Sequence, residues 1–318
     1  MTKSLSYANI QKNALTNNLL KGTTALEERK RRFGDRKDGY LLRDVDAMHY
    51  ITPIIYPNRC DNEAYVSETI DLTNLNAFIA KKNAEKPEFK YTLFHAIVTA
   101  VLKTITLRPR LNRFIANSNL YMRNKISASF IVKKRFNDKS EEGLAFIKAR
   151  PDSTFDTIHD AIKRQVIVVR DDKQSSGSTQ DSMDIINKMP RFLSKAIVRL
   201  IMWLEKRGKC PQFLIADDPY YASVILSNLG SIKLNSGYHH LTNWGTCSIF
   251  VVVGEKALRP KYNADGTFEM REMLDLGLTI DERIADGYYF SKSIRLLKLL
   301  LENPELLEAP LSEEVDFI

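Results

Sequence analysis

The sequence predicts a single large α/β unit, in which helices flank a largely mixed β-sheet. Two observations lead to this class. Stretches rich in β-branched and aromatic residues are mixed with amphipathic helical stretches, without a regular strand-helix-strand alternation. A hydrophobic content of 44% over 318 residues is also enough for a large core. We expect a polar N-terminal arm and linker over residues 1–45, the main domain over 46–310, and an acidic tail over 311–318.

The first half of the main domain contains predicted strands and helices. Strands are expected over residues 48–57, 63–72, 120–136 and 143–151, and helices over 73–87, 91–109 and 153–173. Thr73 is a plausible N-cap for the first helix. The second helix is expected to end just before Pro109, because the residue before a proline avoids the helical conformation.

A basic amphipathic helix is predicted over residues 189–207, ending near Gly208. Its apolar residues fall on one stripe: Met189, Phe192, Leu193, Ala196, Ile197, Leu200, Ile201 and Leu204. Its basic residues are Arg191, Lys195, Arg199 and Lys206. Such a helix can lie on a membrane surface, but packing of the stripe into a core is the commoner outcome and the one we expect.

The C-terminal part of the domain is predicted to hold the most buried strands. Strands are expected over 220–230 and 247–255, followed by a hairpin that turns at Asp265–Gly266. The last helix is strongly amphipathic and is expected to stop at the Asn303–Pro304 dipeptide.

Charge and cysteine content limit the possible partners. The net charge of +8 favours anionic partners such as nucleotide-like cofactors or an acidic membrane face, although a solvated basic surface explains it equally well. Nucleic acid is not expected. Cys60, Cys210 and Cys247 are too few and too scattered for a disulfide framework or a metal site. The sequence has no bilayer-length apolar run and no signal-peptide core, so we expect a cytoplasmic protein.

Several familiar catalytic motifs are absent from the sequence. It contains no Gly-rich phosphate loop, His-Glu-x-x-His helix or G-x-S-x-G elbow. His95 and His159 lie within predicted amphipathic helices and are expected to be structural. The pair His239–His240 lies in a loop that contains glycine and asparagine, where functional residues are more frequent.

Four segments resemble the catalytic domain of the dihydrolipoyl acyltransferases of 2-oxo acid dehydrogenase complexes, and of chloramphenicol acetyltransferase. They are "SETIDLTNLNAFI", "RPRLNRFIANSNLYMRNKISASFIV", "SVILSNLGSI" and "TIDERIADGYYFSKSIRLLKLLLENPELL". Together they place the similarity over residues 48–308. The resemblance implies a chloramphenicol acetyltransferase-like two-layer sandwich.

The resemblance also implies site residues. In that family the histidine of a His-x-x-x-Asp-Gly motif is the general base that removes a thiol proton from coenzyme A or dihydrolipoamide. Asp286 and Gly287 match the motif, whereas Glu282 replaces the histidine. The family aspartate forms an organising ion pair with an arginine, for which Arg43 is the candidate. Ser227 matches the serine that hydrogen-bonds the oxyanion, and its alternative role is a serine that caps a strand end.

The replacement at Glu282 leaves the identity of the base open. A thiol has a pKa of about 8.5 and an ordinary glutamate one of about 4.3, so a carboxylate is a poor base unless burial raises its pKa. His239 and His240 follow Ser227 by one strand and turn, and an imidazole has a suitable pKa. The alternative is that this pair only shapes a loop or a subunit contact.

Two functions therefore remain from the sequence. The first is an acyltransferase that takes an acyl group from coenzyme A or another thioester, in a channel between the subunits of a homotrimer, as the resemblance implies. The second is a non-catalytic relative that acts as a scaffold or regulatory subunit. The 318 residues contain no lipoyl domain and no Ala/Pro-rich linker, which argues against a standard dehydrogenase-complex core subunit. No metal is expected.

Overall fold

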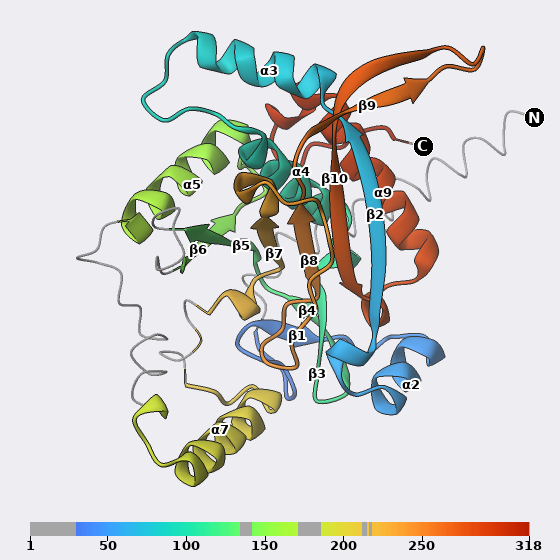
Figure 1. The fold of residues 1–318 in the computed structure, drawn as a ribbon. Coiled ribbons are helices and arrows are strands. Elements are labelled where there is room, and N and C mark those ends of the chain that lie inside the picture. The colour runs from blue at the N-terminus through green and yellow to red at the C-terminus, as the bar shows by residue number, and fades with distance from the viewer. Residues whose placement is uncertain (1–29, 134–141, 171–185, 212–214, 216–217, 318) are drawn as a thin grey trace, which may run out of the picture.

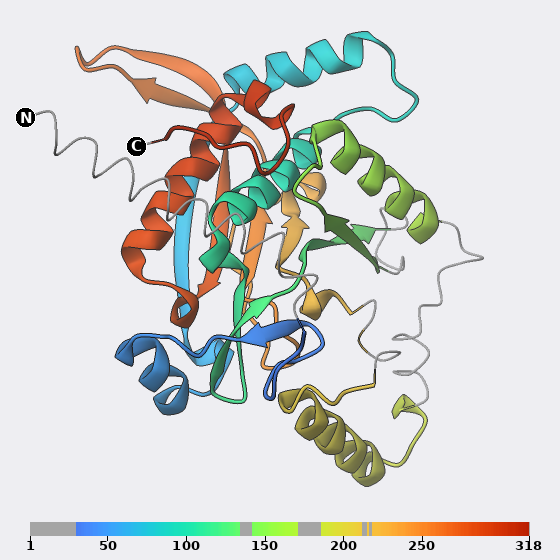
Figure 2. The ribbon, with the colours of Figure 1, turned by 180° about the vertical axis from the view of Figure 1, so that it is seen from behind.

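The structure is a computed structural model that describes residues 30–133, 142–170, 186–211, 215 and 218–317. A seven-stranded mixed sheet forms its centre, and helices cover one face of it (Figures 1 and 2). The α/β sandwich predicted from the sequence is therefore confirmed. The stretch around Gly177 and the expected N-terminal arm up to residue 29 lie outside the described residues.

The order of strands explains why the sheet is mixed. Its strands are β2 (Glu63–Asp71), β10 (Phe268–Asp281), β8 (Ile249–Val253), β7 (Val224–Asn228), β5 (Ile126–Lys133) and β6 (Glu142–Ala149), with β9 (Ala257–Tyr262) beside β10. Strands β5, β7 and β8 are parallel, whereas all other pairs are antiparallel. The predicted hairpin is confirmed, since β9 and β10 flank a turn in which Gly266 has a φ of 85°.

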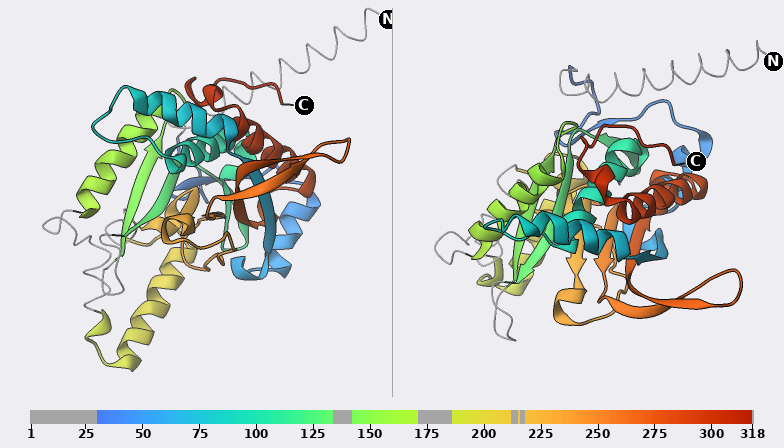
Figure 3. Two further views of the ribbon diagram at one scale, coloured as in Figure 1. Left: turned by 45° about the horizontal axis from the view of Figure 1, so that its top comes forward. Right: turned by 90° about the horizontal axis from the view of Figure 1, so that it is seen from above.

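Four helices pack at one side of this sheet. They are α3 (Thr73–Ala84), α4 (Leu93–Leu107), α5 (Phe155–Arg170) and α9 (Gly287–Glu302). Helix α4 begins with a capping box between Thr92 and His95. It ends at Leu107, with Arg108 as the C-cap, and its end before Pro109 is as predicted. Helices α4 and α9 lie side by side, and α3 lies above them in the left view of Figure 3.

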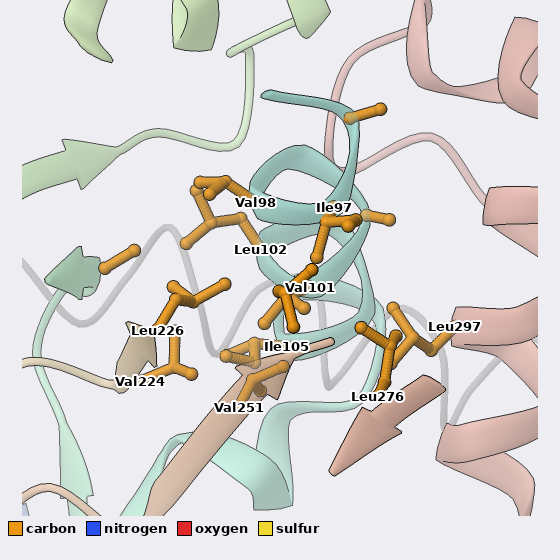
Figure 4. Packing of buried hydrophobic residues seen from close by; sticks show 14 of the residues in the cluster. Ile97, Val98, Val101, Leu102, Ile105, Val224, Leu226, Val251, Leu276 and Leu297 are labelled. Atoms are coloured by element: carbon orange, nitrogen blue, oxygen red, sulfur yellow. The ribbon is translucent and has the colours of Figure 1, made fainter. Parts of the chain in front are cut away.

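The main core lies between α4, α9 and the sheet (Figure 4). Alternate side chains of the central strands point toward α4, among them Leu226 of β7, Val251 of β8 and Leu276 of β10. All three side chains are 0% exposed, whereas their neighbours Ile225 and Val252 point to the opposite face of the sheet. The two faces of the sheet are thus distinct: one is the apolar core, and the other is available for a site.

A small second sheet lies at one end of the molecule. It contains β1 (Gly39–Leu41), β4 (Asn119–Arg123) and β3 (Arg113–Ala116). Strand β1 lies within the stretch expected to be a linker, yet it pairs with β4, and the neighbouring Arg36 side chain is buried. At the other terminus, Leu311 is buried and Phe317 packs against the main core.

The strand predicted over residues 48–57 is wrong. These residues belong to helix α2 (Ala47–Ile55), because the Asp46 side chain caps the helix by accepting a hydrogen bond from the His49 N–H at 3.0 Å. The cap outweighs the strand preference of the β-branched and aromatic residues. The strand expected over 120–136 is likewise divided between β4 and β5.

The basic helix is present as α7 (Arg191–Lys206), but its expected core packing is wrong. Glu205 is its one buried residue in the structure as described, whereas Phe192, Leu200 and Trp203 are at least half exposed. The helix extends away from the sheet (Figure 3, left). The stripe therefore identifies the apolar side of the helix correctly but not its environment. No helix in the described ranges is long and apolar enough to cross a bilayer.

Candidate active site

The first part of the site is the end of strand β7. Ser227 lies opposite Val252 of β8, and alternation with Leu226 directs its side chain to the face away from α4. We call this the loop face, because residues 233–247 cover it. Among the described residues, the half-buried Ser227 hydroxyl has no hydrogen-bond partner. It is therefore available to a ligand.

The residues after Ser227 form a tight turn. The Asn228 side chain accepts a hydrogen bond from the Ser231 N–H at 3.2 Å, and the Asn228 carbonyl accepts one from the Ser231 hydroxyl at 2.7 Å. A Cβ on Gly230 would lie 2.5 Å from the Gly254 carbonyl oxygen. The Ser-Asn-Leu-Gly sequence is thus explained by one turn that needs both the asparagine and the glycine.

The following loop lies flat on the loop face. A Cβ on Gly277 of β10 would be 2.0 Å from the Gly237 carbonyl oxygen, so this contact requires glycine on the strand. The Ser236 hydroxyl donates a hydrogen bond to the Val252 carbonyl at 3.2 Å. These contacts direct the loop along β10 and bring the next residues, His239 and His240, over the sheet.

His239 is exposed but held in a defined orientation. Its ring stacks on Phe250 of β8 at 4.4 Å with an interplanar angle of 7°, and the His240 ring stacks on it at 4.8 Å. Its Nδ1 lies 3.1 Å from the His240 backbone carbonyl. Because a carbonyl oxygen can only accept, Nδ1 is the donor of this contact, and in the neutral form of the ring Nε2 then carries the lone pair.

Ser227 and His239 lie on the same face of the sheet. Ser227 is opposite Val252, and His239 stacks on Phe250, two residues earlier on the same strand. Two residues along a strand span about 7 Å. The structure thus brings the serine and the histidine pair to one region, although no hydrogen bond joins them within the described chain.

A buried ion cluster at the far end of β10 accounts for its terminal charges. The Asp281 carboxylate is 0% exposed and accepts two hydrogen bonds from the Arg283 guanidinium at 2.8 and 2.7 Å. Arg59 lies 3.6 Å from the same carboxylate, and its guanidinium donates to the Thr242 carbonyl at 2.6 Å. Burial lowers the pKa of Arg59, and Asp281 opposes this effect.

Sequence reasoning missed this cluster. It joins the end of β10 to the segment before β2 and to the loop that carries the histidines, since the Arg59 N–H also donates to the Asn243 side chain at 2.7 Å. The sequence did contain a signal for it: Asp281 and Arg283 lie at the end of a buried strand, and a buried charge needs a partner of opposite charge.

Glu282 and Asp286 lie beside this cluster. The Glu282 side chain is exposed, and its N–H donates to the Asn62 carbonyl at 3.0 Å. Asp286 caps α9 by accepting from the Tyr289 N–H at 2.8 Å, and this bond lowers the pKa of its carboxyl. Its ion-pair partner is Arg110 at 3.5 Å.

The expected partner of Asp286 is therefore wrong, because the candidate Arg43 instead donates to the Phe33 carbonyl. The ion pair with Arg110 lies near the surface: the Asp286 side chain is 54% exposed and that of Arg110 is 45% exposed. The carboxylate is held by the helix N-terminus, which leaves it largely in water.

Glu282 does not meet Ser227 within one chain. Ser227 is opposite Val252, which is opposite Gly277, and Glu282 follows Gly277 by five residues. Five residues correspond to about 16 Å along the strand. The family motif and the serine thus lie toward opposite ends of the sheet.

The other candidate residues have structural surroundings. His95 and His159 are buried with their rings 4.8 Å apart, and burial together with the charge of His159 lowers the pKa of His95 to about 3. Cys210 and Cys247 are buried, whereas Cys60 is exposed. Across the ranges that the structure describes, no group of His, Cys, Asp and Glu side chains could hold a metal ion.

The fold defines the class of structure: an α/β sandwich in which helices cover one face of a mixed sheet. Residues 212–309 match the family model of the 2-oxoacid dehydrogenases acyltransferase (catalytic domain). This match includes Ser227, His239, Glu282 and Asp286. The resemblance stated from the sequence is thereby confirmed for the C-terminal part of the chain. No curated protein matches the chain in sequence.

Three solved structures are similar to this chain. The probable dihydrolipoamide acetyltransferase from Listeria monocytogenes is 16% identical, with 87% of this chain and 98% of that chain covered and a TM-score of 0.54. The dihydrolipoamide acetyltransferase of Azotobacter vinelandii is 17% identical over 84% and 93% of the two chains, with a TM-score of 0.49. A chloramphenicol acetyltransferase is 12% identical over 83% and 98%, with a TM-score of 0.48. The first of these carries the fold assignment.

Proposed function

We propose that this protein is an acyltransferase in which His239 is the general base and Ser227 stabilises the oxyanion. The donor is a thioester of coenzyme A or of an acyl carrier, and the acceptor is a thiol, amine or hydroxyl. One observation carries the proposal: His239 and Ser227 lie on the same face of the sheet, and neither His239 Nε2 nor the Ser227 hydroxyl has a hydrogen-bond partner among the described residues. The proposed catalytic unit comprises residues 46–310.

The proposed reaction uses both side chains in one addition and one elimination. The acceptor attacks the thioester carbonyl carbon while His239 Nε2 takes the acceptor proton. The Ser227 hydroxyl donates a hydrogen bond to the resulting oxyanion. The carbon–sulfur bond then breaks, and the imidazolium returns the proton to the leaving thiolate. Acyl group and proton are balanced, and no further reactant is needed.

Glu282 has no base role in this proposal. Its carboxylate is exposed, so the burial that would make it a useful base for a thiol is missing. His240 supports His239 through the ring stack and the backbone carbonyl that fixes its tautomer. Asp286 is assigned a structural role as the cap of α9.

We propose a homotrimer with the substrate channel between subunits. The separation of about 16 Å between Ser227 and Glu282 supports this, because the two ends of the sheet can border one channel only if different copies supply them. Sedimentation equilibrium should give three times 36.5 kDa. A monomer at all concentrations contradicts the shared channel but leaves the pair Ser227–His239 intact.

Coenzyme A is the donor that the charge favours. Its phosphates are anionic, and the chain carries a net charge of +8. Calorimetry with acetyl-coenzyme A should detect binding that weakens as salt is added. Absence of binding at millimolar ligand excludes free coenzyme A and leaves a carrier-bound donor, whereas binding that is independent of salt contradicts only the argument from charge.

The decisive experiment is an acyl-transfer assay that measures thiol release from acetyl-coenzyme A. We expect His239→Ala to lower the rate by roughly 10²–10⁴-fold, as for loss of a general base. Ser227→Ala should lower it by roughly 10²-fold, as for loss of one oxyanion donor. Glu282→Gln is the matched control and should retain activity. Full activity in His239→Ala, with loss in Glu282→Gln, would assign the base to Glu282 instead.

A second candidate function is a non-catalytic scaffold or regulatory subunit. The observation that favours it is the exposed Glu282 at the position where the family has its motif histidine. Absence of turnover by the wild-type protein with acetyl-coenzyme A and with carrier-bound acyl donors would support this function. The stacked histidines would then serve only to hold the loop against the sheet.

A further inference from the structure

Helix α7 presents an unusually apolar surface to solvent. Phe192 is 76% exposed, Leu200 57% and Trp203 50%. At about 100° per residue these three side chains, together with those of Leu193 and Ala196, fall within an arc of about 100°. We call these five residues the exposed stripe. An apolar stripe of this length on a solvated helix indicates a surface that is covered by something else.

The attachment of α7 leaves this stripe free. Glu205, near the C-terminal end of the helix, is the buried anchor: its carboxylate lies 3.3 Å from the Arg36 guanidinium, and its carbonyl accepts from Arg36 at 2.8 Å. Burial raises the pKa of Glu205, while Arg36 opposes this effect. A polar anchor at one end fixes the helix without using its exposed apolar side, so α7 extends outward from the body (Figure 1).

Basic side chains border the exposed stripe. Arg191, Lys195, Arg199 and Lys206 fall within a neighbouring arc of about 80°. Glu205 is the sole acidic residue of α7, and it is engaged with Arg36. Near the border, the Arg207 guanidinium lies 4.0 Å from the Trp203 ring. Phe192 and Trp203 thus lie where the apolar arc meets the basic arc.

We propose that α7 is a docking surface for an anionic lipid bilayer. The helix lies in the plane of the membrane, its exposed stripe enters the boundary between headgroups and acyl chains, and its basic arc contacts anionic headgroups. The combination of an apolar arc, aromatic residues at its edge and lysine and arginine beside it is the pattern of interfacial helices. At 16 residues the helix is about 24 Å long, which suits a surface position rather than a span.

Charge argues against a second copy of this helix as the occupant. Two α7 helices that pair through their stripes would bring together eight basic side chains, four from each copy, without a free acidic partner on either helix. An anionic bilayer instead supplies the opposite charge along the whole basic arc. The proposal does not depend on catalysis and stands whether or not the chain is an acyltransferase.

The first test follows the environment of Trp203 in the full-length chain. The sequence has two tryptophans, so Trp244→Phe leaves Trp203 as the single reporter. Vesicles of phosphatidylcholine mixed with phosphatidylserine should shift the Trp203 emission to the blue, and vesicles of phosphatidylcholine alone should not. A Trp203→Phe protein, which retains Trp244, should show no shift and controls for general effects of the vesicles. An unshifted Trp203 emission on the mixed vesicles overturns the proposal.

The second test measures co-flotation with the mixed vesicles. Replacement of Arg191, Lys195 and Arg199 by glutamine should weaken partitioning by roughly a hundredfold, at about fivefold for each basic residue. Leu200→Ser should weaken it at least tenfold. The matched control is Leu258→Ser on the β9–β10 hairpin, since Leu258 is 66% exposed and lies away from α7. It should partition as the wild type does.

Three results would overturn the bilayer as occupant. They are equal partitioning of the Leu200 and Leu258 variants, equal binding to vesicles with and without phosphatidylserine, and a change of oligomeric state in Leu200→Ser by sedimentation without vesicles. The last would assign α7 to a contact between copies. Unchanged melting temperatures ensure that the variants report the surface, because the exposed stripe contributes little to the folded core.

Discussion

Helices α7 and α9 have the same length but opposite surroundings. Each has 16 residues with an apolar side and basic residues elsewhere. Helix α9 buries five apolar side chains: Phe290, Leu296, Leu297, Leu300 and Leu301. Helix α7 buries only Glu205 among its residues, all of which the structure describes. Amphipathicity thus identifies the apolar side of a helix, but it does not identify what covers that side.

The connections of the two helices explain the difference. Helix α9 follows β10 after five residues, and β10 is fixed by β2 and β8 on its two sides. So short a link directs α9 back onto the sheet, where its leucines meet α4. Helix α7 is separated from β7 by residues 207–223, and the part of this segment that the structure describes contains no strand that would pair with the sheet.

The largest expected effect concerns the buried charge that precedes α9. Asp281→Ala would leave Arg283 and Arg59 without their carboxylate in a buried site. We expect a loss of about 3–5 kcal/mol in the free energy of unfolding, measured by urea denaturation. Asp275→Ala on the same strand is the control, because its pair with Arg259 is partly exposed and should contribute about 0–1 kcal/mol. Equal losses would mean that burial does not distinguish the two pairs.

A matched pair of leucines tests the helices directly. Leu300 of α9 is 0% exposed, so Leu300→Ala should lower the free energy of unfolding by about 2–5 kcal/mol. Leu200 of α7 is largely exposed, and Leu200→Ala should change it by less than about 0.5 kcal/mol. Urea denaturation gives both values from the shift of the midpoint, provided that the slope of the free energy against urea concentration is unchanged. A substantial loss in Leu200→Ala would show that α7 is covered in the isolated protein.

The contact between α4 and α5 should also respond to pH, because His95 and His159 lie there with their rings 4.8 Å apart. His95 of α4 accepts a hydrogen bond from the Thr92 N–H at Nδ1, and its Nε2 is buried without a partner among the described residues. Burial lowers its pKa from 6.5 to about 3, so the unfolded chain binds the proton more tightly. Stability from this group is therefore complete above pH 6.5 and is lost as the pH falls toward 3.

Between pH 7.5 and 5.5 the expected loss from this one group is about 1.4 kcal/mol. Urea denaturation at the two pH values measures it. His95→Gln keeps a side chain that can accept the Thr92 hydrogen bond but does not titrate, so its pH dependence should be smaller by that amount. An unchanged dependence would place the responsible group elsewhere.

Local signals in the sequence predicted much of the fold. Pro109 marks the end of α4, and Asp265–Gly266 marks the hairpin, because each of these features acts within a few residues. Helix α2 was mistaken for a strand because its composition favoured strand, while the deciding Asp46 cap lies outside the aromatic run. The Asp46 cap could have been read from the sequence, but the prediction gave more weight to the composition of the stretch.

The site could be predicted only in part. Ser227, His239 and His240 were found as separate candidates, but their common face depends on the contact of Gly237 with Gly277, which lie forty residues apart in the chain. The partner of Asp286 could not be chosen either, because Arg110 reaches it only after α4 and α9 have packed together. Such relations depend on the assembled sheet rather than on local sequence.

The smallest effect is expected at Asp286, the N-cap of α9. Its side chain is about half exposed, accepts the Tyr289 N–H at 2.8 Å and lies 3.5 Å from Arg110. Asp286→Ala should therefore lower the free energy of unfolding by about 1 kcal/mol, the usual value for a lost cap. Asp286→Asn keeps a capping oxygen but removes the charge, and Arg110→Ala removes the partner, so each should have less effect. A loss in Asp286→Ala as large as that in Asp281→Ala would mean that Asp286 is buried in solution, as it would be if a second subunit covered the start of α9.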